Sequence, residues 1–253
     1  FSEYHFHRIM RAHLNEPLGS YVKRLRLDKA AMLLQNTRHP VSEIAYQVGY
    51  ETPAAFTKAF KQRFQVAPAT FREDQLNHRL EMNLVKPSKP GAMELKKPKI
   101  KKCKPKKVVY ISHFGPYQNI GESNVWGRLV DFVKKHKLFG FKTELIGISH
   151  DSPDITGSDK LRYDACVTVR KEIEPEGEVG FKEIPEGNYA TFRHLGPYEN
   201  FSETYRAIFK DWLPKSGLEL RDAPSYEAYL NNPGNTKPEK LKTDIYIPVA
   251  NGG

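Results

Sequence analysis

The stretch VSEIAYQVGYETPAAFTKAFKQRF, residues 41–64, predicts two short helices joined by a tight turn. In the first helix, 42–48, Ser42 is placed to cap free amides, and apolar residues recur at helical spacing. Gly49 suits the left-handed conformation that ends a helix and reverses the chain. The second helix begins at Thr52, a capping residue followed by a first-turn proline. The pattern indicates a helix-turn-helix, and the alternative is an ordinary helical hairpin in a core.

The second helix has one apolar face and one polar face. Phe56, Phe60 and Phe64 recur every four residues, with Ala55 and Ala59 beside them, so we expect this face to be buried. The residues left pointing away from it are Thr57, Lys58, Lys61 and Gln62. Two lysines on the free face favour contact with a polyanion.

The flanking sequence predicts further helices. A long helix is expected over 18–36 after Pro17, and Phe71 can anchor a last short helix behind Pro68. A helix also begins at Ser2. Its apolar residues are Phe6, Ile9 and Met10, and its outward residues are Glu3, Tyr4, His7, Arg8 and Arg11. Such a polar face is either a solvated surface or a source of donors to base edges and phosphates.

The positive charge is unevenly distributed along the 253 residues, whose net charge is +10. Residues 1–79 hold 12 Lys and Arg against 7 Asp and Glu, whereas residues 108–253 hold 18 against 21. The first part therefore suits a polyanion and the second does not. No apolar run approaches the roughly 18 residues of a membrane span, and two cysteines without metal spacing fit a reducing compartment. We expect a cytoplasmic protein without cofactor, metal site or membrane contact, and a first residue Phe1 that is not the natural start.

Residues 1–73 resemble the DNA-binding domain of AraC/XylS-type transcription regulators, which have two helix-turn-helix units bridged by a long helix. The family pattern I-A-x-x-x-G-[FY]…F-x-x-x-F-K…P-x-x-[FY]-R is matched by Ile44, Ala45, Gly49, Tyr50, Phe56, Phe60, Lys61, Pro68, Phe71 and Arg72. The resemblance implies that double-stranded DNA is contacted by Tyr4, His7, Arg8, Arg11, Pro53, Ala54, Thr57, Lys58 and Lys61. One departure is that Pro53, Ala54 and Ala55 carry no side-chain donors, so the second helix is expected to contact phosphates more than bases.

Residues 80–95 read as a linker because their centre is rich in proline, glycine and lysine. The lysine run at 96–107 is either a disordered basic arm or an exposed edge strand. We favour the strand, because Ile100 and Cys103 interrupt the run and it leads directly into the apolar residues 108–111.

The second half of the chain contains an internal repeat. The segment HFGPYQN at 113–119 returns as HLGPYEN at 194–200, an offset of 81 residues. The segment at 160–169 returns at 240–249, an offset of 80 residues. Each copy predicts strand, strand, helix, strand, strand, with the helices at 122–136 and 201–213. Two copies of this size should pack about a pseudo-two-fold axis and leave a cleft between them.

Glu227 is exceptional because it interrupts a strand, 226–230, that is otherwise aromatic and apolar. By the 81-residue offset its counterpart is Ile146. If its face lines the cleft, a carboxylate ringed by aromatic side chains would favour organic cations; if not, it is a glutamate on a solvated strand. The aromatic candidates for this site are Tyr117, Tyr198, Trp126, Phe114, Tyr163 and Tyr229. For each ring, core packing is the alternative.

Residues 98–249 resemble the GyrI-like effector-binding domain. The residues on which this resemblance depends are the two repeated HxGPYxN segments, 185–189, 226–231 with Pro233, and 243–248. This resemblance implies a bulky, often cationic or aromatic ligand in the cleft between the repeats and assigns Glu227 as the residue facing it. The combined architecture resembles the Rob-like regulators.

The predicted fold is therefore multidomain: an all-α tandem helix-turn-helix domain over 1–79, a linker over 80–95 and an α+β duplicated strand-helix-strand-strand domain over 96–253. The predicted function is a ligand-responsive transcription regulator with DNA and a small-molecule effector as partners, and RNA polymerase as a further candidate partner. No catalytic residue is assigned. Two alternatives remain: a GyrI-like hydrolase of electrophilic compounds using Glu227 with Tyr117 or Tyr198, and a protein-interaction module.

Overall fold

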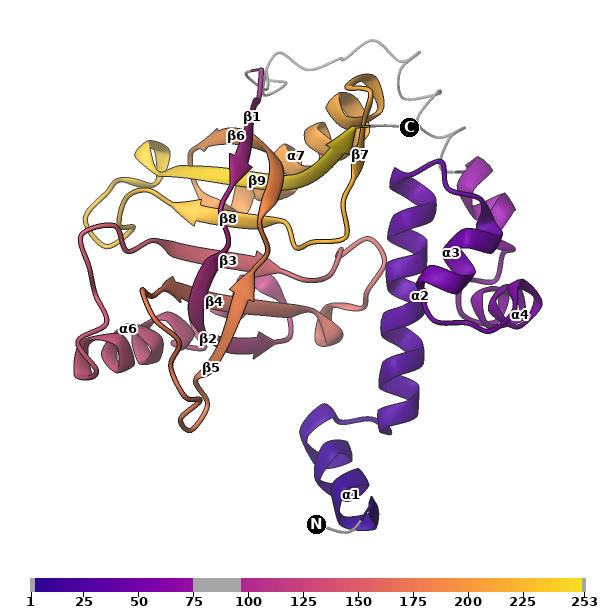
Figure 1. Cartoon of the computed structure of the whole chain (residues 1–253), viewed down its shortest axis with the longest axis horizontal. Coiled ribbons are helices and arrows are strands. Elements are labelled where there is room, and N and C mark those ends of the chain that lie inside the picture. The colour runs from indigo at the N-terminus through magenta and orange to yellow at the C-terminus, as the bar shows by residue number, and fades with distance from the viewer. Residues whose placement is uncertain (1–2, 75–96, 252–253) are drawn as a thin grey trace. The chain divides into compact units, whose positions relative to one another are not determined.

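The chain forms two compact units, Phe1–Ser88 and Lys89–Gly253 (Figure 1). The computed structural model describes residues 3–74 and 97–251, so the predicted linker, 80–95, lies outside the described residues. Each unit has its own buried apolar side chains.

The first unit is helical. Its helices are α1 (Glu3–Leu14), α2 (Leu18–Asn36), α3 (Val41–Gln47) and α4 (Pro53–Phe64), followed by a helical segment over 68–74. The bounds of α2 are those predicted, and its buried face includes Leu27, Ala30, Ala31 and Leu34 as expected. This long helix contacts α1, α3 and α4.

The turn between α3 and α4 has the predicted geometry. Gly49 has a φ of +84°, in the left-handed region. Thr52 caps α4 by accepting a hydrogen bond at 3.2 Å from the backbone N–H of Ala55, and Pro53 occupies the first turn. The predicted cap at Ser42 is wrong: α3 begins at Val41 behind Pro40, so Ser42 lies inside the first turn and makes no cap.

Aromatic rings fill the core beneath α4. Phe56 and Phe60 are fully buried, and the Phe60 ring lies 4.5 Å from Phe64 and 5.4 Å from Phe71, centroid to centroid. Ala55, expected on this face, is exposed. The rings of four successive aromatic residues thus hold α4 and the segment after it together.

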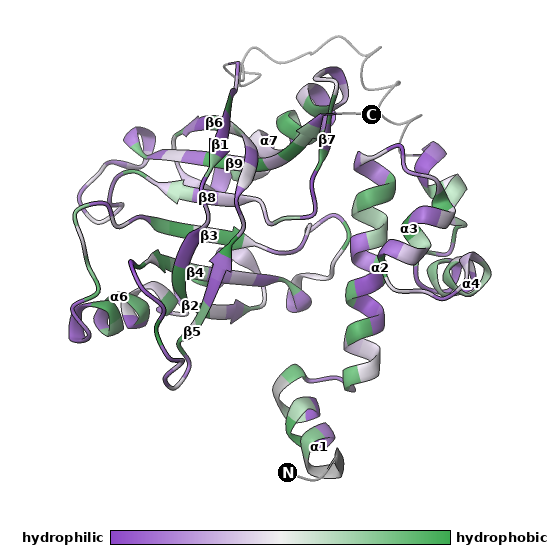
Figure 2. Ribbon diagram, in the orientation of Figure 1, coloured by the Kyte–Doolittle hydropathy of each residue, from purple (hydrophilic) through white to green (hydrophobic). Residues whose placement is uncertain are grey.

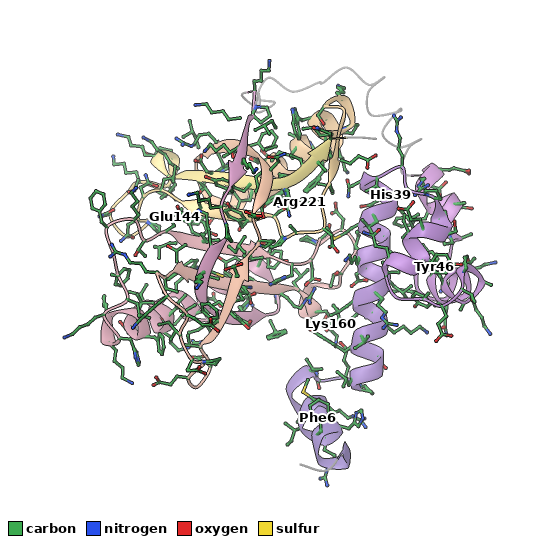
Figure 3. All side chains as sticks on the ribbon, in the orientation of Figure 1. Phe6, His39, Tyr46, Glu144, Lys160 and Arg221 are labelled. Atoms are coloured by element: carbon green, nitrogen blue, oxygen red, sulfur yellow. The ribbon has the colours of Figure 1, made fainter. Side chains whose placement is uncertain are left out.

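The expected apolar face of α1 is not buried. Phe6 and Ile9 are 47% and 54% exposed, because no described element of this unit covers that side of the helix (Figure 3). Tyr46 on α3 is also largely exposed.

The second unit repeats one order of elements twice, as predicted. The first copy consists of β1 (Lys99–Cys103), β2 (Lys106–Phe114), α6 (Val125–Lys135), β3 (Leu145–Ser149) and β4 (Arg162–Thr168). The second consists of β5 (Gly180–Ile184), β6 (Gly187–Leu195), α7 (Phe201–Arg206), β8 (Tyr226–Tyr229) and β9 (Lys242–Asn251). Two additions distinguish the second copy: α7 continues as a π-helix, Ala207–Trp212, and a short strand β7, Leu218–Leu220, pairs with β9.

The two copies exchange their first strands. Within residues 97–251 the antiparallel sheet has the order β1-β6-β9-β8-β3-β4-β2-β5, with β7 beside β9. Strand β1 therefore pairs with β6 of the second copy, and β5 pairs with β2 of the first. The lysine-rich segment forms an edge strand, as favoured from the sequence. The middle of the sheet is the β3–β8 pair, one strand from each copy.

Apolar side chains lie on both faces of this sheet. One face packs against α6 through Val125, Leu129 and Val133. The second copy packs Ile208 against its own strands, and a third cluster on the opposite face includes Ile146 and Tyr226. Strand β3 is mostly hydrophobic, whereas β1 is mostly hydrophilic (Figure 2). The central pair is therefore covered on both sides.

Candidate ligand-binding site and DNA-binding helices

Glu227 lies at the centre of the sheet. It pairs with Gly147 in β3 and with Ile245 in β9, and its side chain is only 1% exposed. The prediction that Ile146 is the counterpart of Glu227 in the first copy is wrong. Gly147 pairs with Ala165, and Ala165 and Ile245 are related by the 80-residue offset, so Gly147 is the structural counterpart of Glu227. The two equivalent positions thus face each other across the boundary between the copies.

The two oxygens of the Glu227 carboxyl have different surroundings. The Tyr205 hydroxyl donates a short hydrogen bond to Oε1, and Ser149 Oγ donates to the same oxygen at 3.5 Å. Oε2 is buried and has no hydrogen-bond partner among the described residues. Burying a carboxylate oxygen without a hydrogen-bond donor costs free energy. A positively charged or hydrogen-bond-donating ligand would remove this cost by binding to Oε2.

Burial raises the pKa of Glu227 to about 7, and the hydrogen bonds from Tyr205 and Ser149 oppose this shift. The cause is the loss of hydration, which disfavours the charged form of a carboxyl group. The side chain can therefore gain or lose its proton near neutral pH, and a bound cation would favour the ionised form.

The structure brings all but one of the predicted aromatic residues together. The hydroxyls of Tyr163 and Tyr229 lie 3.0 Å apart. The Tyr229 ring makes edge contacts with Trp126 at 5.5 Å and with Tyr198 at 5.3 Å, and Tyr117 lies against Tyr163 at 6.4 Å. These rings come from both copies, and Tyr117, Tyr163 and Tyr229 lie within electrostatic reach of the Glu227 carboxylate. A ligand that reaches Glu227 must displace some of them.

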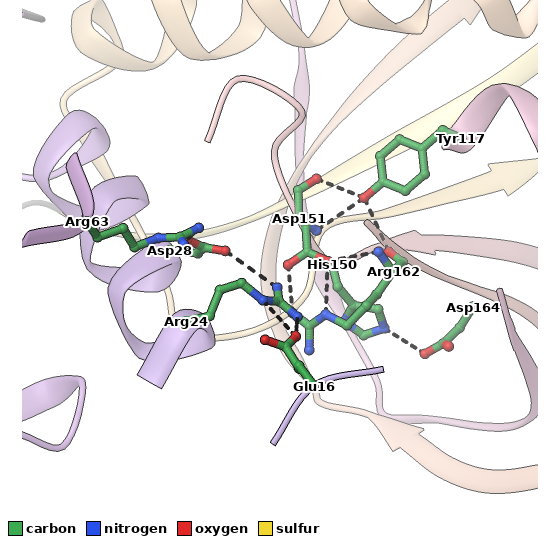
Figure 4. A network of polar contacts seen from close by, with 9 residues as sticks. All are labelled: Glu16, Arg24, Asp28, Arg63, Tyr117, His150, Asp151, Arg162 and Asp164. Carbon is green, nitrogen blue, oxygen red and sulfur yellow. Dashed lines mark hydrogen bonds and ion pairs between the residues drawn. The ribbon is translucent and has the colours of Figure 1, made fainter. Parts of the chain in front are cut away.

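Two predicted residues differ in role from this group. Phe114 ends β2 with its ring 53% exposed, and no ring contact within residues 97–251 joins it to the cluster. The Tyr117 hydroxyl donates to the backbone oxygen of Asp151 at 2.8 Å, and Asp151 itself binds Arg162 (Figure 4). Tyr117 therefore offers its ring, because its hydroxyl is already engaged by the backbone.

Three site residues were not assigned from the sequence. They are Tyr205, which lies in the predicted helix 201–213, and Ser149 and Gly147, which lie in β3. The 80-residue offset of the second repeated segment is the signal that finds Gly147, because it places this glycine opposite Glu227. The alternation of β3 then places Ser149 on the same face.

In the helical unit, the predicted DNA-contacting side chains are mainly on the surface. His7, Arg8 and Arg11 of α1 are exposed, and the Tyr4 side chain lies outside the described residues. On α4, Ala54, Lys58 and Lys61 are exposed, and Pro53 and Thr57 are half-buried. The assignment of these residues to DNA remains a prediction.

A buried ion-pair network joins α2 to α4. Asp28, which is 4% exposed, accepts hydrogen bonds from Arg63 at 2.5 and 2.9 Å and lies 3.8 Å from Arg24. Arg24 also binds Glu16 at 2.8 Å (Figure 4). Since Arg63 belongs to α4, this network fixes the orientation of α4 on the long helix.

Within residues 3–74 and 97–251, no group of His, Cys, Asp and Glu side chains is arranged to hold a metal ion. None of the helices in these ranges is long and apolar enough to cross a membrane.

Two family models match the chain. Residues 96–250 match the GyrI-like small molecule binding domain, and residues 1–74 match a helix-turn-helix domain. The protein named "Probable transcriptional regulator YgiV" of Escherichia coli K12 is 33% identical over 111 residues, which are 43% of this chain and 69% of that protein. The transcriptional regulator Rob of Salmonella typhimurium is 33% identical over 72 residues, 28% of this chain and 25% of that protein.

A solved structure of an EcmrR–DNA complex has the same fold. It aligns with a TM-score of 0.55 and 17% identity, and the match covers 97% of this chain and 82% of that chain. A helix-turn-helix domain followed by a small-molecule binding domain defines a ligand-responsive transcription regulator. The chain belongs to the GyrI-like small molecule binding domain family, and its N-terminal part is an AraC-type helix-turn-helix domain.

Proposed function

We propose that this regulator acts in the cytoplasm and that its effector is a bulky aromatic cation, bound where the rings now cover Glu227. The observation that carries the proposal is the buried carboxyl group whose Oε2 has no partner among the described residues, surrounded by aromatic rings. Coulomb attraction and cation–π contact, at about 0.5–2 kcal/mol per ring, both favour such a ligand.

The effector would act by population shift. A cation binds the ionised carboxylate, so it stabilises arrangements in which the rings move aside and Glu227 is accessible. Binding rather than turnover is supported by the helix-turn-helix domain and by relatives that are named transcriptional regulators. Double-stranded DNA and RNA polymerase are the macromolecular partners that we propose, and the EcmrR–DNA structure supports them by analogy.

The ligand proposal is tested by thermal unfolding of the whole chain with three aromatics of equal size that are cationic, neutral or anionic. Only the cation should raise the unfolding temperature in a saturable way. At a ligand concentration 100 times Kd the gain is about 2.7 kcal/mol. Equal stabilisation by the neutral compound would show that Glu227 does not select charge.

The DNA proposal is tested by two substitutions on exposed helix faces. Arg8→Ala should weaken binding to a specific site more than binding to random duplex, because an arginine at a reading position contacts bases. Lys61→Ala should weaken both by a similar factor and reduce the salt dependence by about one unit of slope, as expected for a phosphate contact. Fluorescence anisotropy at several salt concentrations measures both effects. Unchanged affinity in both variants would contradict the assignment.

A further inference from the structure

Three oxygen atoms converge above the Cα of Gly147. A Cβ placed on this glycine would lie 2.5 Å from the hydroxyl oxygens of both Tyr163 and Tyr229, and 2.8 Å from Oε2 of Glu227. With contacts this short, a side chain at position 147 would force at least one of these three groups to move. The missing side chain therefore leaves the three oxygens facing one small region at the middle of the sheet.

These oxygens are hydrogen-bond acceptors with unused capacity. Oε2 of Glu227 has no partner among the described residues. The two tyrosine hydroxyls share one hydrogen bond of 3.0 Å, which uses one of their two protons, and Tyr163 also has a hydrogen bond with Trp126. The hydroxyl that donates in the pair keeps its lone pairs as acceptors. Oε1, by contrast, already accepts from Tyr205 and Ser149. The acceptors that a ligand could use are thus those above Gly147.

This arrangement distinguishes two kinds of organic cation. A protonated primary amine carries three N–H donors, whereas a quaternary ammonium carries none. A quaternary head group would cover Oε2 and both hydroxyls without donating to them, and each buried acceptor left without a donor weakens binding. A primary ammonium satisfies them with charge-assisted hydrogen bonds, which are about twice as strong as neutral ones.

We infer that the effector's head group is a hydrogen-bond-donating ammonium bound by Glu227, Tyr163 and Tyr229 above Gly147. This inference rests on the proposed function, because it presupposes that a cation binds at Glu227. It makes Gly147 and the tyrosine hydroxyl pair the determinants of specificity, while the rings of Trp126 and Tyr198 hold the aromatic part.

The test compares two cations on two proteins. The probes are 2-(2-naphthyl)ethylammonium and its N,N,N-trimethyl derivative, with 2-(2-naphthyl)ethanol as the uncharged reference. Calorimetric titration of the whole chain should show the primary ammonium binding at least tenfold more tightly than the trimethyl compound. Tyr229→Phe keeps the ring contacts and removes one acceptor. It should lower primary-ammonium affinity about tenfold and leave trimethyl affinity unchanged.

Tyr198→Phe is the matched control, because this tyrosine contacts the Tyr229 ring but its hydroxyl is not among the three oxygens. It should not change the preference between the two cations. Equal affinity of both cations, well above that of the alcohol, would overturn the inference and leave the proposed function standing. If neither cation binds more tightly than the alcohol, both are overturned. Equal losses of affinity for both cations in Tyr229→Phe would assign that tyrosine a packing role and also overturn the inference.

Discussion

Glu227→Gln is expected to raise the stability of the unliganded protein at pH 8 and to remove its affinity for aromatic cations. The folded carboxyl has a pKa of about 7, against an ordinary value of 4.5. Between these two values the folded state holds a proton that the unfolded chain has lost. The contribution of this carboxyl to stability is therefore fully present below pH 4.5 and is lost as the pH rises through 7.

The size of the stability change follows from the difference between the folded and unfolded pKa values of Glu227. Each pKa unit corresponds to about 1.4 kcal/mol, so the ionised, buried carboxylate costs about 3 kcal/mol above pH 7. Glutamine is never ionised and can still accept the hydrogen bond from Tyr205. The variant should therefore be more stable than the parent protein at pH 8 by up to about 3 kcal/mol, and equally stable at pH 4.5.

Cation binding should show the opposite trend with pH, because the ligand requires the ionised carboxylate. Affinity of the parent protein is expected to fall about tenfold from pH 8 to pH 6 and that of Glu227→Gln to be low at both.

Tryptophan fluorescence measures unfolding of this unit, since the two tryptophans of the chain, Trp126 and Trp212, both lie in it. Glu183→Gln, an exposed carboxyl on β5, is the control and should change neither property. Undiminished cation affinity in Glu227→Gln would remove Glu227 from the site.

Asp28→Ala is expected to unfold or severely destabilise the helical unit. The substitution removes the carboxylate that neutralises Arg63 and lies beside Arg24, and it leaves these guanidinium groups without their shared acceptor. Breaking a buried ion pair by removing one partner costs about 3–5 kcal/mol. DNA affinity should fall with it, because α4 loses its attachment to α2.

Circular dichroism at 222 nm follows this loss, because the first unit consists of helices. The fluorescence transition of the two tryptophans should stay unchanged, which separates damage to the first unit from general unfolding. Glu43→Ala is the matched control: its carboxylate is 55% exposed and pairs with His39 on the surface, where such pairs contribute at most about 1 kcal/mol. If Asp28→Ala unfolds like Glu43→Ala, the network does not hold α4.

Much of the architecture could be predicted because it depends on local chemistry. Gly49 and Thr52 fix the turn by backbone conformation and capping, which neighbouring residues determine. The repeat fixed the order of elements in the second unit. The exchange of β1 and β5 could not be predicted in this way, since the choice of partner strand depends on contacts between residues far apart in the chain.

The candidate site was predictable in composition but not in geometry. An acidic residue within an aromatic strand identified Glu227 from the sequence alone. The 81-residue offset predicts the wrong counterpart, because the second repeated segment has an offset of 80 residues and a single offset cannot serve both. In a strand, an error of one residue moves a side chain to the opposite face, so the 81-residue offset points to Ile146 although Gly147 is the residue paired with Glu227.

The reciprocal placement of β1 and β5 has a consequence for how this module could have originated. In the arrangement seen here, one copy made alone would leave both its leading strand and the outer edge of its second strand unpaired, so two such chains could assemble by exchanging leading strands. Fusing them end to end would convert an assembly sensitive to concentration into one that is not. It would also free each half to change independently, so that one could acquire an acid at the shared axis while the other kept a glycine.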